Sequence, residues 1–140
     1  MAWSSSRVDF ATMQRGERIP PFDLRIDGDA VRAYLDATGE AAEGLWEQYV
    51  PPLALGALAL GGLMDRVQVP GGLVHTGQEY EFRGLVPVGA TVEVQIAVAA
   101  RSERRGAVIT VFETELRLDG KVVGTGRTNV MMAADEDLPL

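Results

Sequence analysis

Few side chains in this sequence could do chemistry. His75 is the only histidine in 140 residues, and there is no cysteine, so disulfides, thiolate zinc sites and cysteine nucleophiles are excluded. A carboxylate and an imidazole are the usual general acids and bases, which makes Glu40 and His75 the candidate catalytic residues. Each has a plainer interpretation: Glu40 as a solvated side chain after a glycine, and His75 as a hydrogen-bonded residue near the start of a strand. We expect no metal and no cofactor.

A second candidate is the start of an apolar helix at Pro51-Pro52-Leu53-Ala54. The free amides of Leu53 and Ala54, together with the positive end of the helix dipole, could polarise a bound carbonyl group. The two prolines remove two possible donors. Leu53 and Ala54 are therefore predicted to bind substrate rather than to catalyse.

Charge and composition exclude several classes of protein. A formal net charge of -7 has the wrong sign for binding the phosphates of nucleic acid. The apolar run Tyr49–Met64 is shorter than the roughly 20 residues that a membrane helix needs, so we expect no membrane partner. The first 15 residues lack the apolar run of a secretory signal, and the length fits one domain over residues 1–140. We expect a cytoplasmic protein.

The first half of the chain predicts two helices. Ile19–Ile26 is an extended segment, and Asp27 can cap a helix over Gly28–Thr38 that Gly39 ends. A second helix should start at Pro51-Pro52 and run to Asp65 or Arg66. Because this second helix is apolar all round, we expect the protein to enclose it, with Leu60 in the core.

The second half predicts strands. Apolar and polar residues alternate there, which is typical of strands with one buried face. The segments are Gln78–Arg83, Thr91–Ala99, Val108–Leu118 and Lys121–Met132. Hairpin signals stand at Asp119-Gly120 and, more weakly, at Arg104-Arg105-Gly106.

These elements predict an α+β fold in which a curved antiparallel sheet wraps one apolar helix. The order is that of the hot-dog fold. A sheet of this size leaves uncovered edges, so we expect at least a dimer.

The segment His75–Thr91, HTGQEYEFRGLVPVGAT, resembles the stretch after the central helix in MaoC-like hydratases and dehydratases. The pattern there is His-Gly-x-Gln-x-Phe-x-Tyr, a few residues, then Pro-x-x-x-Gly-Asp. Its matches in this chain are His75, Gly77, Gln78, Tyr80, Phe82, Pro87 and Gly89, with Ala90 in place of the acid. The most similar members are the first, non-catalytic half of two-domain proteins and the substrate-holding subunit of heterodimeric dehydratases. Gly77 and Gln78 join the predicted substrate-binding residues.

The resemblance implies a hydro-lyase that adds water to an enoyl thioester or removes it, in fatty acid or polyketide metabolism. Active members carry an Asp and, five residues later, a His before the central helix, in a loop of the form Ser-Gly-Asp-x-Asn-Pro-x-His. Here the matching positions hold Glu40 and Leu45, and leucine cannot transfer a proton. Whether the chain is itself an enzyme is therefore open.

The preferred function is a substrate-holding hydratase/dehydratase subunit. Its ligand would be an acyl-CoA or acyl-carrier-protein thioester, and it would form a homodimer or a heteromer with a catalytic MaoC-like subunit. Three alternatives stay open: a hot-dog thioesterase, a non-catalytic acyl-CoA-binding module, and a repurposed cyclase or dehydratase of secondary metabolism.

Overall fold

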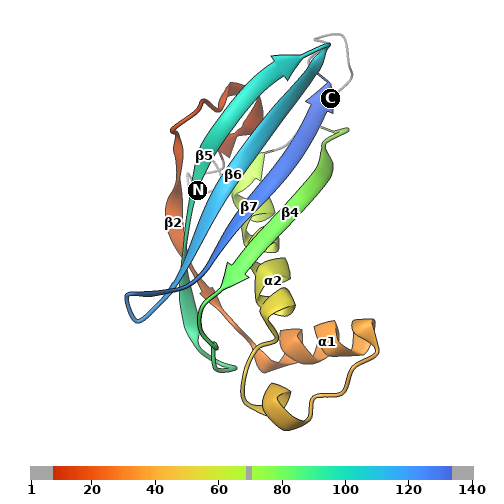
Figure 1. Ribbon diagram of the computed structural model, residues 1–140, viewed down its shortest axis with the longest axis vertical. Helices are drawn as coiled ribbons and strands as arrows, with labels where there is room; N and C mark the ends of the chain where they lie inside the picture. The colour runs from red at the N-terminus through yellow and green to blue at the C-terminus, as the bar shows by residue number, and fades with distance from the viewer. Residues whose placement is uncertain (1–7, 69–70, 134–140) are drawn as a thin grey trace, which may run out of the picture.

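The computed structural model describes residues 8–68 and 71–133, and the acidic segment 134–140 lies outside them. Its main feature is a curved five-stranded antiparallel sheet in the order β2-β5-β6-β7-β4 (Figure 1). The strands are β2 (Arg18–Arg25), β4 (Val74–Phe82), β5 (Thr91–Arg104), β6 (Ala107–Leu118) and β7 (Lys121–Ala133). Two short strands, β1 (Val8–Asp9) and β3 (Val67–Gln68), pair in parallel beside this sheet.

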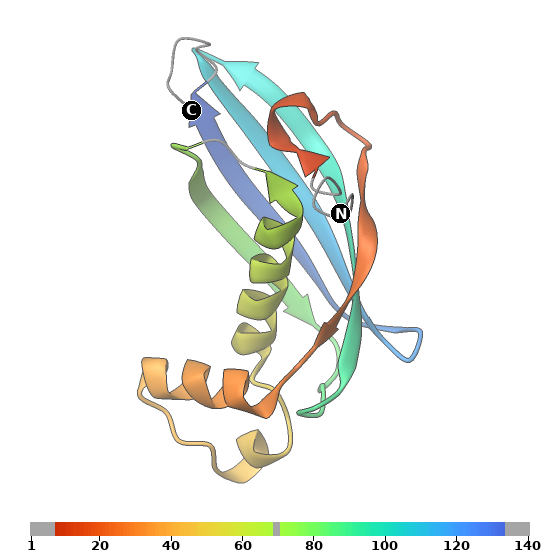
Figure 2. The same ribbon diagram turned by 180° about the vertical axis from the view of Figure 1, so that it is seen from behind.

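Two helices complete the arrangement. Helix α2 (Pro52–Arg66) lies along the concave face of the sheet, and helix α1 (Gly28–Thr38) lies across one end of the molecule (Figure 2). Single 3-10 turns follow β1 and α1, at η2 (Phe10–Thr12) and η3 (Gly44–Glu47). Both predicted helices are confirmed, including the Asp27 cap, whose carboxylate accepts the Asp29 amide, and the left-handed Gly39 at the end of α1.

The core lies between α2 and the inner face of the sheet. Leu55, Ala59 and Leu63 of α2 are buried there against alternate residues of β5 and β6, among them Ile96 and Phe112. Opposite faces of the same strands carry charged residues, as the alternation predicts. The α+β hot-dog arrangement expected from the sequence is thus the observed one.

The observed topology adds two facts. Strand β4 pairs with β7, the last strand, rather than with β5, which follows it in the chain. The extended segment around Pro20 and Pro21 becomes β2, the opposite edge strand, with a register shift between Ile19 and Phe22. Proline fits such an edge because it lacks an amide hydrogen for the ladder.

Both predicted hairpins are present. Asp119 and Gly120 have φ of 51° and 81°, and Arg105 and Gly106 have φ of 52° and 79°. Two consecutive left-handed residues are what a tight two-residue hairpin requires.

Helix α2 is enclosed on one side only. Leu53 is 67% exposed and Leu60 is half-buried, whereas Leu55 and Leu63 are buried. Leu60, which we expected in the core, is half-buried and packs against the core cluster. The apolar pattern of α2 thus covers more of its circumference than the sheet does. In the part of the chain that the structure describes, no helix is long and apolar enough to cross a membrane.

Candidate functional site

A groove of about 350 Å³ runs along the uncovered side of α2. Its lining comes from three elements: Tyr34 of α1; Leu53, Gly56, Ala57 and Leu60 of α2; and Gln78 and Tyr80 of β4. The four α2 positions follow a spacing of three and four residues and so form one stripe of the helix. Since most of these side chains are apolar, the groove suits a flexible apolar group rather than a charged one.

Tyr80 forms the inner wall of this groove. Its hydroxyl donates a hydrogen bond to the carbonyl oxygen of Gly56 over 2.8 Å. A Cβ built on Gly56 would lie 2.5 Å from Cε2 of the ring, and one built on Gly126 of β7 would lie 2.5 Å from Cε1. The ring therefore fills a slot between helix and sheet that only two glycines leave open. Burial raises the pKa of the Tyr80 phenol to about 12, so the hydroxyl stays protonated at neutral pH.

Gln78 ties β4 to β7 beside the groove. Its amide nitrogen donates to the carbonyl oxygen of Arg127 over 3.0 Å, and its amide oxygen accepts from the hydroxyl of Thr128 over 2.8 Å. Nε2 of His75 lies 3.2 Å from the same amide oxygen. Gln78 thus lines the groove, while these bonds also fix the register of the edge strand.

Gly77 and His75 stand at the beginning of β4. A register shift separates them, and a Cβ on Gly77 would lie 3.2 Å from Nδ2 of Asn129. Neither residue is part of the groove lining, and the His75 side chain is exposed. Among the residues that the structure describes, Gln78 is the one polar side chain within hydrogen-bond distance of the His75 ring.

Glu40 lies just beyond α1. Its amide donates to the carbonyl oxygen of Leu35 over 2.8 Å, which completes the end of the helix, and its side chain is exposed. Leu45 follows on η3 and is 51% exposed. Helix α1 and η3 lie at one end of the molecule, whereas β4 begins towards the other (Figures 1 and 2). The structure therefore does not bring Glu40 and His75 together.

The start of α2 borders the groove. Pro51 precedes the helix without a side-chain cap, and the amide of Leu55 bonds to the carbonyl oxygen of Pro51. The amides of Leu53 and Ala54 come before this first turn closes, so they belong to the donors that a helix start leaves unpaired within the helix. Ala54 turns its methyl group into the core and Leu53 turns its side chain to the groove. These two predicted residues thus share one short segment.

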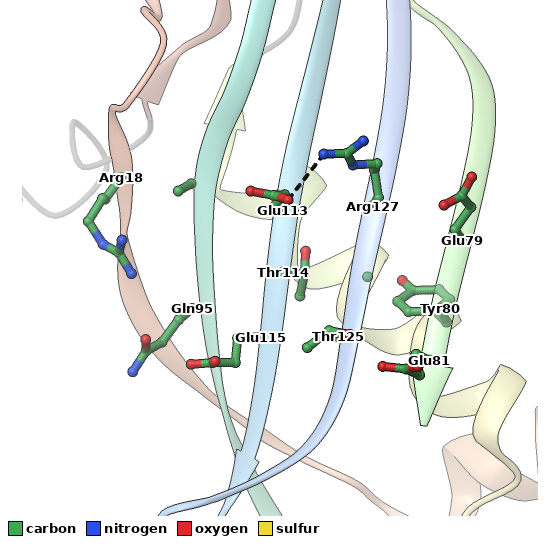
Figure 3. A pocket seen from close by; sticks show the side chains of 12 residues that line it. Arg18, Glu79, Tyr80, Glu81, Gln95, Glu113, Thr114, Glu115, Thr125 and Arg127 are labelled. Atoms are coloured by element: carbon green, nitrogen blue, oxygen red, sulfur yellow. Dashed lines mark hydrogen bonds and ion pairs between the residues drawn. The ribbon is translucent and has the colours of Figure 1, made fainter. Parts of the chain in front are cut away.

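A larger hollow, of about 510 Å³, lies on the outer face of the sheet (Figure 3). Charged and polar side chains surround it, and Glu113 and Arg127 form an ion pair across β6 and β7 over 3.2 Å. Tyr80, Ala97 and Gly126 also line this hollow, but most of its lining residues are charged or polar. Within residues 8–68 and 71–133, no three histidine, aspartate or glutamate side chains are grouped so that they could hold a metal ion.

Comparison with solved structures identifies the fold to which this arrangement of helices and strands belongs. The (R)-hydratase from A. caviae involved in PHA biosynthesis matches 85% of this chain and 96% of its own, with a TM-score of 0.68 and 22% identity. The chain has a hot-dog fold. A C-terminally truncated HadBC complex, a 3R-hydroxyacyl-ACP dehydratase from Mycobacterium tuberculosis, gives a TM-score of 0.64 at 21% identity over 87% of this hot-dog chain and 99% of its own.

A MaoC-like dehydratase from Rhodospirillum rubrum is similar as well, with a TM-score of 0.68 and 15% identity over 89% of this chain and 95% of its own. No family model and no curated protein matches the sequence. The hot-dog fold is therefore carried by structural likeness, not by sequence identity.

Sequence reasoning did not assign five of the groove residues to a site: Tyr34, Gly56, Ala57, Leu60 and Tyr80. The sequence placed them in apolar elements and, for Tyr80, in the family motif, without a role in binding. The available signal was the pair of glycines at positions 56 and 126, but nothing in the sequence shows that these two positions face the same ring.

Proposed function

We propose that this hot-dog chain is a MaoC-like, cytoplasmic protein that holds the acyl group of an enoyl thioester as the substrate-binding subunit of a hydratase or dehydratase. The observation that carries the proposal is the apolar groove along the start of α2, in a fold shared with hydratases, without a proton-transferring pair beside it. The carbonyl of the thioester would lie at the Leu53 and Ala54 amides, and the acyl chain would follow the stripe from Leu53 to Leu60.

The missing proton transfer is the reason to assign a holding role. Hydration needs a base within hydrogen-bond reach of the water and a donor for the α-carbon. The side chains at the two matching positions are an exposed carboxylate, Glu40, and an exposed hydrocarbon, Leu45. A second subunit would supply the Asp and His. Complexes of two hot-dog chains occur among the similar structures, as in HadBC.

The partner would pair with strand β4. This strand ends the sheet, spans nine residues without proline, and borders the exposed side chains Leu53 and Val74. The opposite edge, β2, carries Pro20 and Pro21 and a register shift, which blunt it against pairing. The two edges thus differ, and β4 is the one suited to a second hot-dog chain of either kind.

The test is an activity assay of the chain alone and with a partner. The partner is a hot-dog protein encoded nearby that carries the Ser-Gly-Asp-x-Asn-Pro-x-His loop, copurified with the tagged chain. We expect crotonyl-CoA hydration by the complex to exceed that of the isolated chain by about 10²–10⁴-fold, the usual effect of a general acid or base. Hydration by the isolated chain at ordinary enzymatic rates would overturn the proposal, and loss of that rate in Glu40→Gln or in His75→Gln would then identify the catalytic residue.

A gain-of-function variant tests the same point from inside the chain. Glu40→Asp combined with Leu45→His restores the two residue types, and we expect it to raise hydration above that of wild type. Glu40→Asp combined with Leu45→Met is the matched control, because it changes both positions without adding a proton-transferring group. Equal rates for the two double variants would argue against a hydratase groove in this chain.

A further inference from the structure

The outer face of the sheet, away from α2, divides into an uncharged part and a charged part. Residues that are paired across neighbouring antiparallel strands share one face, so the register shows which side chains form a row across the sheet. Two neighbouring rows at the end where β4 begins contain no charged residue. Five of their side chains are apolar, and we call them the outer patch: Val74, Ala100, Ile109, Val111 and Met131.

The outer patch is open to solvent in the single chain. Val74 is 51% exposed and Met131 is 36% exposed, Ala100 is exposed, and Ile109 and Val111 are half-buried between their neighbours. In the described part of the chain, no helix covers this face, because α2 lies on the opposite, concave side (Figures 1 and 2). A contiguous apolar patch beside charged residues is typical of a contact surface.

The next row along the same face carries charges of both signs. The register places Arg18, Glu113, Arg127 and Glu79 in this row, in that order across the sheet. Glu113 and Arg127 form an ion pair with each other. Arg18 and Glu79 have no ion pair among the described residues, and they stand on opposite sides of the hollow, on β2 and β4 (Figure 3). One unpaired positive charge and one unpaired negative charge therefore lie at the two edges of one row.

We infer that the outer faces of two copies of this chain stack on each other about a two-fold axis that runs along β6. Such an axis places each row opposite the same row of the second copy and reverses the order of the strands, so that β2 lies over β4. The outer patch then covers the outer patch of the second copy. Arg18 of each copy faces Glu79 of the other, which gives both unpaired charges a partner. Packing of two sheets face to face with nearly aligned strands is a common arrangement.

This contact is separate from the groove and from the open edge of β4. It uses neither of them, so it does not depend on the proposed binding of an acyl group. Combined with strand pairing at β4, stacking produces an assembly of four chains; without that pairing it produces a dimer. Val74 borders both surfaces, and the test therefore uses residues that lie in only one of them.

Ile109→Lys tests the apolar part of the contact. Ile109 lies on β6, which is next to neither edge strand, and the two-fold axis places it opposite its own copy. Two lysines would then meet in an apolar contact, and we expect the dissociation constant of the stacked pair to rise by at least about tenfold. Sedimentation equilibrium at micromolar concentration should give half the mass of wild type. Thr125→Lys is the matched control: Thr125 is half-buried on the same face but lines the hollow, so its variant should keep the wild-type mass.

A charge exchange tests the direction of the axis. We expect Arg18→Glu and Glu79→Arg each to weaken stacking by about tenfold at low ionic strength, because each brings like charges together. Both changes in one chain should restore the wild-type dissociation constant. Within one chain the two residues are four strand spacings of about 4.8 Å apart, so this restoration requires contact between copies. Both side chains are exposed, so the exchange also decides the question if Ile109→Lys does not fold.

Three results would overturn the inference: a monomeric wild type, an unchanged mass in folded Ile109→Lys, or a double charge variant that is as weak as the single ones. If the outer patch bound a lipid surface or an unrelated protein instead, the mass of the pure protein would be the same in all of these variants. That result would also exclude a second copy as the occupant of this face.

Discussion

Glycines on the inner side of α2 allow aromatic rings to reach the helix backbone. A Cβ on Gly56 would lie 2.5 Å from the Tyr80 ring, and one on Gly62 would lie 2.7 Å from the Phe22 ring. Nothing lies within 4 Å of the Cβ position of Gly61, which is exposed on the same helix. The glycines of this helix therefore have different roles. Gly56 and Gly62 allow a ring to pack against the helix, whereas nothing packs against Gly61.

Alanine substitutions should separate these roles. We expect Gly56→Ala and Gly62→Ala each to lower the free energy of unfolding by about 1–3 kcal/mol, because the added methyl group must displace a packed ring. Gly61→Ala should instead raise it by about 0.5–1 kcal/mol, since alanine is the better helix former where space is free. Urea unfolding followed by circular dichroism measures all three. Equal effects at the three positions would show that the packing of the rings against α2 is not as described.

At the scale of the elements, α2 presents leucines in opposite environments. Leu63 is 1% exposed in the core and Leu53 is 67% exposed in the groove. We expect Leu63→Ala to lower the free energy of unfolding by about 2–5 kcal/mol, because it leaves a cavity. At protein concentrations at which the chain is a monomer, Leu53→Ala should change the same free energy by less than about 0.5 kcal/mol. Thermal or denaturant unfolding of the two variants compares one residue type on one helix.

A stability loss in Leu53→Ala as large as that in Leu63→Ala would mean that a partner already covers Leu53 in solution. Repeating the measurement over a range of protein concentrations would show this, because stability from an interface depends on concentration.

The sequence predicts the helices and hairpins of this fold better than it predicts which elements lie next to each other. Helix bounds, the Asp27 cap and both hairpins depend on residues close together in the chain, and all are confirmed. The pairing of β4 with β7 joins residues that are far apart, such as Gln78 and Thr128, and alternation contains no information about which strand pairs with which. For the same reason, the sequence did not predict that only one side of α2 is covered. A helix that is apolar all round does not show which element covers each of its sides.

The candidate site shows the same limit. Leu53 and Gln78 line the groove, and the sequence singles both out because a helix start and a motif can be recognised locally; their role in binding substrate stays a prediction. Tyr80 belongs to the same motif, yet its position against Gly56 and Gly126 depends on three separate elements. A single sequence does not reveal which residues of separate elements come together to form a site.

On the scale of the whole molecule, the apolar groove and the unpaired edge of β4 lie next to each other. The groove is lined by α2 and β4, and the exposed side chains of Leu53 and Val74 belong to those same elements. A partner strand added to β4 would extend the sheet beyond one chain and cover part of α2 at the same time. One contact surface would then satisfy both the open backbone edge and the exposed apolar side chains.

Assembly through this edge has a direct test. We expect light scattering at micromolar concentration to give at least twice the 15.1 kDa mass of one chain. Val74→Lys should shift the equilibrium towards the monomer by about tenfold or more, because a pair of like charges would be brought close to the paired edges. Leu85→Lys is the matched control: Leu85 is 45% exposed, against 51% for Val74, but lies outside β4. A wild-type monomer, or equal shifts in the two variants, would exclude β4 as the edge at which a second copy of the chain binds.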